Sequence, residues 1–226
     1  MNTERKYNEY YEGEGLAFGE APSPELSLLL KRKPHRGKAL DLGAGDGRNS
    51  LYLAQLGFLV TAVDVSEVGL DKLKRAARKR KVEDRIETLE ADVRKLSLPR
   101  KEFDLIVAET VFDHIPAEEI ESLFQRTAGW LRRSGSVYIK VHTVDDPGNN
   151  DDKRVASELA PMVKYYFKRN ELLSMVLDRL HITWYSEQGE TDTTHGETHQ
   201  HVFAKIWAQD EPLLNEESGS GAGKTT

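Results

Sequence analysis

Short apolar runs alternate, along the first two thirds of the chain, with segments whose apolar residues recur every three or four positions. Short apolar runs that alternate with helical patterns are typical of parallel strands joined by helices. The pattern therefore predicts an α/β fold with helices on both faces of a parallel sheet. The strands expected in this part of the chain are 38–43, 59–65, 86–92, 103–109 and 135–142.

The helices between these strands have recognisable first residues. Ser66 is a good N-cap, and Leu70 and Leu73 follow it at helical spacing. Because the apolar residues keep that spacing, the basic stretch 72–81 is interpreted as a solvated helix face and not as a nucleic-acid patch. A further helix is expected from Ala117 to Leu131.

The pattern changes after Thr143. A polar loop at 145–152 leads to helical patterns at 153–165 and 169–179. Two strand-like runs, 181–187 and 199–208, then predict a closing hairpin.

The most informative motif is the loop Asp41-Leu-Gly-Ala-Gly-Asp-Gly-Arg48, which joins the first strand to a helix. Alternating glycines let the backbone turn sharply and approach a ligand without a Cβ in the way. The loop therefore predicts a site for a nucleoside-like cofactor.

The spacing of the loop helps to identify the cofactor. The dinucleotide pattern is G-x-G-x-x-G, whereas this loop has G-x-G-x-G and carries Asp46, a carboxylate that would repel a pyrophosphate. Asp64 ends the second strand and can accept both ribose hydroxyls, which fits NAD and S-adenosylmethionine equally. Asp92 ends the third strand and can accept from an adenine amino group. Together these features favour S-adenosylmethionine.

At this point the chain resembles the class I S-adenosylmethionine-dependent methyltransferases. The resemblance depends on the glycine loop, Asp64, Asp92 and the fourth strand 103–109. A narrower resemblance to the tellurite-resistance type depends on Gly47-Arg-Asn-Ser-Leu-Tyr-Leu-Ala54, Phe167-Lys-Arg-Asn-Glu-Leu172, and Trp184-Tyr-Ser-Glu187 with Gly189-Glu190.

The resemblance covers roughly residues 5 to 208. It implies a doubly wound, Rossmann-like sheet of seven mostly parallel strands whose last strand is antiparallel. It also implies methyl transfer to a small acceptor, such as tellurite, selenite or a soft thiol-like compound. The tellurite-resistance type commonly has a His-Arg pair after its Gly-Glu, whereas this chain has Thr191-Asp192. Because of this difference, the identity of the methyl acceptor is left undecided.

Ligands of open α/β sheets bind beyond the carboxyl ends of the strands, so the loop and the strand ends should converge on one crevice. The residues expected to bind the cofactor are Tyr7, Tyr11, Asp41, Gly43, Ala44, Gly45, Arg48, Asn49, Asp64, Val65, Asp92, Val93 and Glu109. His114, His142 and His195 are the candidate catalytic residues, each acting as a general base or as a cation that binds an oxyanion, with Glu187 also expected at the acceptor pocket.

His195, His199 and His201 form a cluster near the closing hairpin. Neutral imidazoles so placed can hold zinc or another borderline metal, can contact an anionic acceptor, or can be solvated without a special role. The sequence does not decide among these alternatives, and no metal ligand set is assigned from it.

Composition limits the remaining possibilities. A chain of 226 residues with 38% apolar content is expected to form one domain over 1–208, with an N-terminal cap segment at 1–33 and a flexible tail at 209–226. The P-loop-like end Gly219-Ser-Gly-Ala-Gly-Lys-Thr225 belongs to that tail, because no strand precedes it. The absence of cysteine excludes disulfides and a cysteine nucleophile.

No run approaches the ~18 apolar residues of a membrane span, and the first residues have no apolar leader, so a soluble cytoplasmic protein is expected. The net charge of -6 argues against a general nucleic-acid binder. The expected partner is a small-molecule substrate, in a monomer or homodimer. A nicotinamide-dependent oxidoreductase and a non-catalytic cofactor- or metal-binding module are the alternatives. Lys140, within an expected buried strand, has no explanation at this level.

Overall fold

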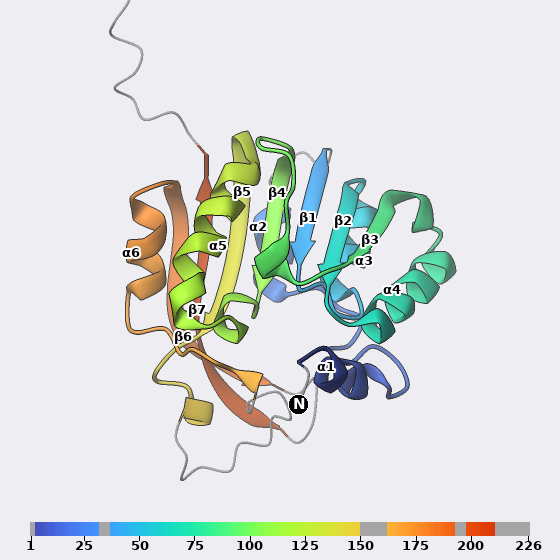
Figure 1. The fold of residues 1–226 in the computed structure, drawn as a ribbon, viewed down its shortest axis with the longest axis horizontal. Helices are drawn as coiled ribbons and strands as arrows, with labels where there is room; N and C mark the ends of the chain where they lie inside the picture. Colours follow the sequence, from blue (N-terminus) through green and yellow to red (C-terminus); the bar gives the residue numbers. More distant parts are fainter. Residues whose placement is uncertain (1–2, 32–36, 150–161, 193–197, 211–226) are drawn as a thin grey trace, which may run out of the picture.

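A computed structural model describes residues 3–31, 37–149, 162–192 and 198–210. Its centre is a seven-stranded sheet with the order β3-β2-β1-β4-β5-β7-β6 (Figure 1). The first five strands are parallel, and β7 runs antiparallel to both β5 and β6. The expected doubly wound sheet with an antiparallel last strand is confirmed. The strands are β1 (Lys38–Leu42), β2 (Leu59–Asp64), β3 (Ile86–Glu90), β4 (Phe103–Glu109), β5 (Leu131–His142), β6 (His181–Asp192) and β7 (His199–Gln209).

Helices cover both faces of the sheet, because each face carries its own cluster of buried apolar side chains. One cluster packs α5 and α6 against the sheet, and the other packs α2, α3 and α4 against the opposite face (Figure 1). None of the helices in the described ranges has the length and apolar character needed to cross a membrane. The helices are α1 (Thr3–Tyr11), α2 (Pro24–Leu30), α3 (Arg48–Leu56), α4 (Glu67–Arg80), α5 (Ala117–Trp130) and α6 (Glu171–Leu177).

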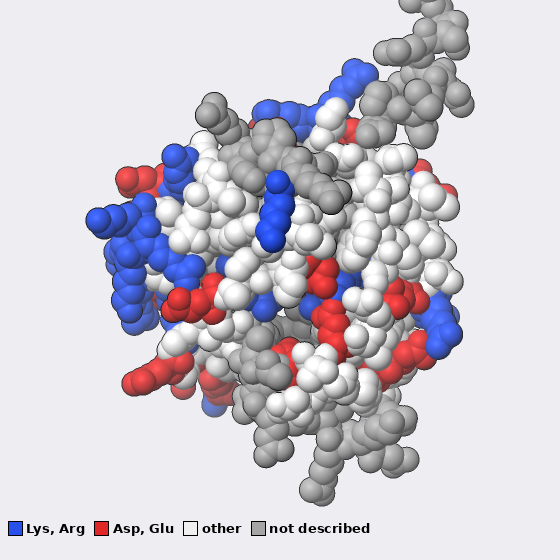
Figure 2. Space-filling model, turned by 180° about the vertical axis from the view of Figure 1, so that it is seen from behind, with Lys and Arg blue, Asp and Glu red and all other residues white. Residues whose placement is uncertain are grey.

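Helix α4 follows the expected pattern. Its N-cap is Ser66, whose Oγ accepts a hydrogen bond from the Gly69 backbone amide at 3.0 Å. Leu70 and Leu73 are buried under it. Its Lys and Arg side chains gather at one edge of the molecule, as the blue side chains on the left of Figure 2 show. The basic stretch is therefore one face of an amphipathic surface helix.

The boundaries differ from the expected ones mainly after residue 130. Leu131 begins β5 and does not end the preceding helix, because it pairs with Phe103 of β4. In the closing hairpin, β6 continues to Asp192 and pairs with β7 on both sides of a register shift between Ile182 and Trp184. Since β7 itself continues to Gln209, the expected domain boundary at 208 falls within a strand.

The helical pattern expected at 153–165 is wrong for residues 163–165, which are not helical. There Lys164 and Tyr165 donate backbone hydrogen bonds to the carbonyl of Asp113, which satisfies their amides outside any helix. Residues 153–161 of that pattern, most of the 209–226 tail and residues 32–36 lie outside the described ranges.

Candidate functional site

The glycine loop joins β1 to α3 in a conformation that few other residues adopt. Gly43 and Gly45 have φ values of 66° and 55°, in the left-handed region. A Cβ on Gly43 would lie 2.5 Å from Val111 Cγ2, and a Cβ on Gly45 would overlap the hydroxyl of Tyr11. The glycines therefore allow a tight turn against two other segments of the chain.

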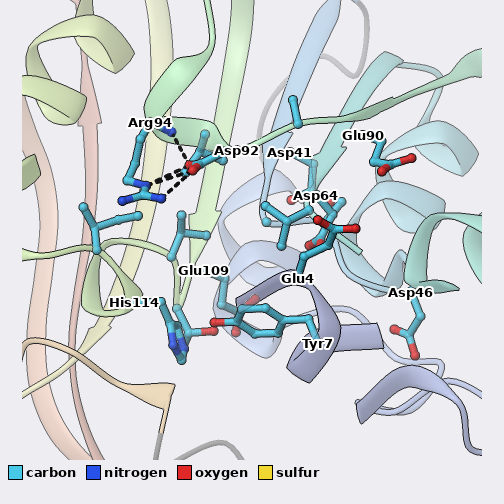
Figure 3. A pocket seen from close by; sticks show the side chains of 18 of the residues that line it. Glu4, Tyr7, Asp41, Asp46, Asp64, Glu90, Asp92, Arg94, Glu109 and His114 are labelled. Carbon is cyan, nitrogen blue, oxygen red and sulfur yellow. Dashed lines mark hydrogen bonds and ion pairs between the residues drawn. The ribbon is translucent and has the colours of Figure 1, made fainter. Parts of the chain in front are cut away.

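A cavity of about 470 Å³ lies beside this loop, at the carboxyl ends of β1, β2, β3 and β4 and against α1 (Figure 3). Its volume is in the range of ligand pockets. All of the expected cofactor-binding residues line it except Gly45, which is next to two residues that do, Tyr11 and Asp64. The expected residues that line the cavity are Tyr7, Tyr11, Asp41, Gly43, Ala44, Arg48, Asn49, Asp64, Val65, Asp92, Val93 and Glu109.

Asp64, at the end of β2, is almost fully buried and fixes the glycine loop. One carboxylate oxygen accepts from the Gly45 amide and the other from the Ser66 amide, each at 2.8 Å. Burial raises the pKa of Asp64 against the effect of these hydrogen bonds. Because an ionised carboxylate has about four acceptor positions, two remain for the hydroxyls of a ribose.

Asp92, just past the end of β3, is held by a residue that the sequence analysis did not identify. Arg94 donates to both carboxylate oxygens, with an Nη2 to Oδ2 distance of 2.5 Å, and these hydrogen bonds lower the pKa of Asp92 (Figure 3). An adenine amino group would therefore share this carboxylate with a guanidinium.

Glu109, at the end of β4, is the centre of a buried ionic network. Arg48 Nη2 lies 3.0 Å and Lys140 Nζ 3.4 Å from Glu109 Oε1, and Asn49 donates to the other oxygen at 2.7 Å. Burial raises the pKa of Glu109, but the two cations outweigh it and lower the pKa to about 2. The carboxylate is therefore ionised at any physiological pH.

The same network explains Lys140. Its ammonium also pairs with Glu190 of β6 at 3.2 Å and lies 4.0 Å from the centre of the Phe203 ring. A lysine is accommodated in a buried strand because two carboxylates and an aromatic face surround its charge.

The N-terminal segment closes the cavity from one side. Ser66 Oγ donates to Asn8 Oδ1 at 2.7 Å, and Lys72 Nζ donates to the carbonyls of Tyr11 and Gly13. Asp46, within the glycine loop, accepts from the Ala17 amide. These contacts hold α1 across the strand ends, which is why Tyr7 and Tyr11 reach the cavity (Figure 1).

Of the two candidate catalytic histidines that the structure describes, His114 lines the cavity and His142 does not. Its ring packs edge-on against Tyr7, with the ring centres 5.9 Å apart (Figure 3). His114 Nδ1 lies 3.0 Å from the Met162 carbonyl oxygen, which can only accept, so Nδ1 is the protonated nitrogen and Nε2 carries the lone pair. Burial lowers the pKa of His114, which favours the neutral ring.

His142 does not line the cavity, contrary to the expectation. It is buried behind the cavity wall, where both its Nδ1 and its backbone amide bond to the carboxylate of Asp113. Glu187 is also absent from the lining, since its carboxylate accepts from the Asn170 amide at 2.7 Å and from the Tyr185 hydroxyl. His195 lies outside the described residues.

Several residues of the cavity wall were not identified from the sequence. Arg94 could have been suggested by the sequence, because it follows the expected site residue Asp92 by only two positions. The others come from the N-terminal segment, from strand ends and from loops, and no sequence spacing connects them. They are Glu4, Phe18, Glu90, Ala91, Arg94, Lys95, Thr110, Val111, Ile115 and Lys164.

The charge of the wall distinguishes between cofactors. Among the described residues that line the cavity, seven are Asp or Glu and four are Lys or Arg. Two of the four cations, Arg48 and Arg94, already pair with Glu109 and Asp92. An acidic wall repels a pyrophosphate and attracts the sulfonium and ammonium groups of S-adenosylmethionine. The residues present therefore fit the methyl donor.

Comparisons with known proteins agree with this chemistry. A family model described as a methyltransferase domain matches residues 39–135, which contain the glycine loop, Asp64 and Asp92. A probable S-adenosyl-L-methionine-dependent methyltransferase TehB of Haemophilus influenzae is 35% identical over 88 residues, which are 39% of this chain and 30% of that protein. A phosphatidylethanolamine N-methyltransferase of Cereibacter sphaeroides is 30% identical over 134 residues, 59% of this chain and 64% of that protein.

Among solved structures, TehB from Haemophilus influenzae superposes with a TM-score of 0.68 at 23% identity, over 91% of this chain and 66% of that one. This similarity shows the fold. The matched part of the chain covers 30% of the length of the TehB relative and 64% of the length of the N-methyltransferase. The matched domain is of the type that uses S-adenosylmethionine as its cofactor, which argues against the nicotinamide alternative.

Proposed function

We propose that this chain, which carries a methyltransferase domain on the class I fold, transfers a methyl group from S-adenosylmethionine to a small-molecule acceptor. The observation that carries the proposal is the acidic cavity at the strand ends, bounded by the glycine loop and by Asp64. When bound, the cofactor supplies an activated methyl group on its sulfonium. The protein then has to orient the acceptor in line with that group and to exclude water.

The glycine loop and Asp64 hold the nucleoside in this proposal, since both ends of the Asp64 carboxylate are fixed by backbone amides. Helix α1 covers the cavity and limits the entry of water, through Tyr7 and Tyr11. Fixed partners on the protein side mean that little reorganisation is needed when the methyl group is transferred.

We expect Asp64→Ala to raise the dissociation constant for S-adenosylmethionine by roughly five- to 150-fold. The reason is that two ribose hydroxyls lose their acceptor, at about 1 to 3 kcal/mol. Calorimetric titration measures the effect, with Asp71→Ala on the half-exposed face of α4 as control. Because Asp64 also holds two backbone amides, urea unfolding should show a loss of stability as well. An unchanged affinity would remove Asp64 from the site.

His114 is the side chain best suited to accept a proton from the acceptor. It lines the cavity, is favoured in its neutral form by burial, and has its basic nitrogen at Nε2. In the proposed reaction the carbon–sulfur bond of the donor breaks, the bond to the acceptor forms, and the acceptor's proton passes to His114.

His114→Ala should therefore lower the turnover number by about 100-fold or more for an acceptor that carries a proton, which is the usual contribution of a general base. The dissociation constant for S-adenosylmethionine should stay close to that of the unmodified protein, because the group acts on the acceptor side. The control is His181→Ala, an exposed histidine at the start of β6. Equal turnover in the two variants would exclude His114 as the base.

For the acceptor, we propose a chalcogen oxyanion, such as tellurite or selenite, or a thiol-like nucleophile. The motifs that resemble the tellurite-resistance type, together with the similarity to TehB over 88 residues, support this class. The test is the formation of S-adenosylhomocysteine by the full chain with tellurite, selenite, a small thiol and a small amine in parallel. Turnover with the amine alone would overturn the acceptor class and leave the methyltransferase assignment intact. The absence of product with every acceptor would count against the proposed reaction as a whole.

A further inference from the structure

The far end of the β6–β7 hairpin carries a second group of polar side chains, distinct from the cavity. His199 and His201 are two positions apart on β7 and so point to the same face of the strand. Asp192, the last residue of β6, is the cross-strand partner of His199. In Figure 1 this end of the hairpin extends past β5 toward the side where α1 lies. None of the three side chains lines the cavity.

The nitrogen atoms of this group converge. His199 Nε2 lies 2.8 Å from His201 Nε2, and one ligand atom from each of Asp192, His199 and His201 lies within 4.8 Å of the other two. His201 is buried, whereas Asp192 and His199 are half-buried, so the group is open to solvent on one side.

The orientation of His201 is fixed by a buried carboxylate. Its Nδ1 lies 2.9 Å from Asp146 Oδ2, which also accepts from the Val202 amide at 2.8 Å. The other oxygen of Asp146 accepts from the Gly148 amide at 2.7 Å. A histidine whose Nδ1 donates to a carboxylate has its lone pair on Nε2, and this arrangement is typical of histidines that bind metals.

From this geometry we infer that Asp192, His199 and His201 form a binding site for a divalent first-row transition cation, with Zn²⁺ as the representative ion. Two imidazoles and one carboxylate are a common ligand set for zinc and for iron, and three protein ligands leave positions open for water or an anion. Asp146 is the residue that orients His201. A neighbouring group, His142 with Asp146 and His201, is the weaker candidate because Asp146 and His142 Nδ1 are already engaged.

The distance between the two imidazoles requires only a small adjustment. Two imidazole nitrogens on a tetrahedral zinc ion, each about 2.0 to 2.1 Å from the metal, are about 3.3 to 3.4 Å apart. The two Nε2 atoms would therefore separate by about half an ångström from their 2.8 Å contact. His199 lies at the start of β7, where such a shift disturbs few neighbours.

The experiment is a titration of the purified full chain, without a histidine tag, with zinc chloride by calorimetry. We expect one equivalent to bind. His199→Ala and Asp192→Asn should each weaken binding by at least tenfold, since each removes one of three ligands. Both residues are half-buried, so the variants should fold, which circular dichroism checks.

The matched control is His181→Ala, at the opposite end of the same hairpin, which should bind zinc as the unmodified protein does. If the unmodified protein binds no zinc, or if His199→Ala and Asp192→Asn bind it as tightly as the control, the inferred site is wrong. The titration needs neither S-adenosylmethionine nor an acceptor, so its failure and the failure of the proposed reaction are independent.

Discussion

Replacing Gly45 with valine should reduce the affinity for S-adenosylmethionine by more than 100-fold. Gly45 has a φ of 55°, which a β-branched residue rarely adopts, and its Cβ would overlap the hydroxyl of Tyr11. The backbone amide of Gly45 also donates a hydrogen bond to the Asp64 carboxylate at 2.8 Å. One substitution therefore disturbs the loop, the ribose acceptor and the helix that covers the cavity. Calorimetric titration with S-adenosylmethionine measures the loss.

Gly13→Val is the matched control, because a Cβ on Gly13 meets nothing within 4 Å. We expect this variant to bind the cofactor as the unmodified protein does. Near-normal binding by Gly45→Val would mean that the ligand lies elsewhere and that the glycine loop is only a tight turn.

Glu109→Gln is expected to cause the largest loss of stability, about 3 to 5 kcal/mol in the free energy of unfolding at pH 7. The substitution leaves the buried Lys140 and the half-buried Arg48 without the carboxylate that pairs with both. Breaking a buried ion pair on one side typically costs this much. Urea unfolding followed by circular dichroism measures it. Glu121→Gln, which breaks the exposed pair with Arg179, should cost less than about 1 kcal/mol.

The effect should depend on pH in a defined direction. The pKa of Glu109 is lowered from 4.5 to about 2 in the folded protein, so its ionised form stabilises the fold above about pH 4.5. That contribution is lost as the pH falls from about 4.5 to about 2, and the difference in unfolding free energy between Glu109→Gln and the unmodified protein should shrink over this window. If Glu109→Gln lowers the free energy of unfolding no more than Glu121→Gln does at pH 7, the ion pairs of Glu109 do not stabilise the fold as proposed.

Much of the fold could be predicted because the sheet is buried on both faces. A buried strand has to be apolar, so the runs that end at Asp64 and Glu109 are visible in the sequence. The polar residue at the end of each run marks the carboxyl edge of the sheet, where the cavity lies. For this reason the sequence predicts that the glycine loop, Asp64 and Asp92 lie at this edge, and all of them contribute to the cavity wall.

The remaining features depend on contacts between segments far apart in the chain. His142 lies at the end of a strand, and His114 lies just past the end of another, so the sequence gives the two residues similar positions. His142 nevertheless lies behind the cavity wall, because its ring bonds to the carboxylate of Asp113. Lys140 is explained only by Glu109 and Glu190, which reach it from two other strands. Residues that meet in this way have no fixed spacing in the sequence, so periodicity alone does not identify them.

The most direct test of the central claim is a calorimetric comparison of S-adenosylmethionine, S-adenosylhomocysteine and NAD on the unmodified full chain. The acidic cavity predicts one equivalent of S-adenosylmethionine and one of S-adenosylhomocysteine, in competition with each other, and no measurable binding of NAD. Binding of NAD with no binding of S-adenosylmethionine would contradict the account.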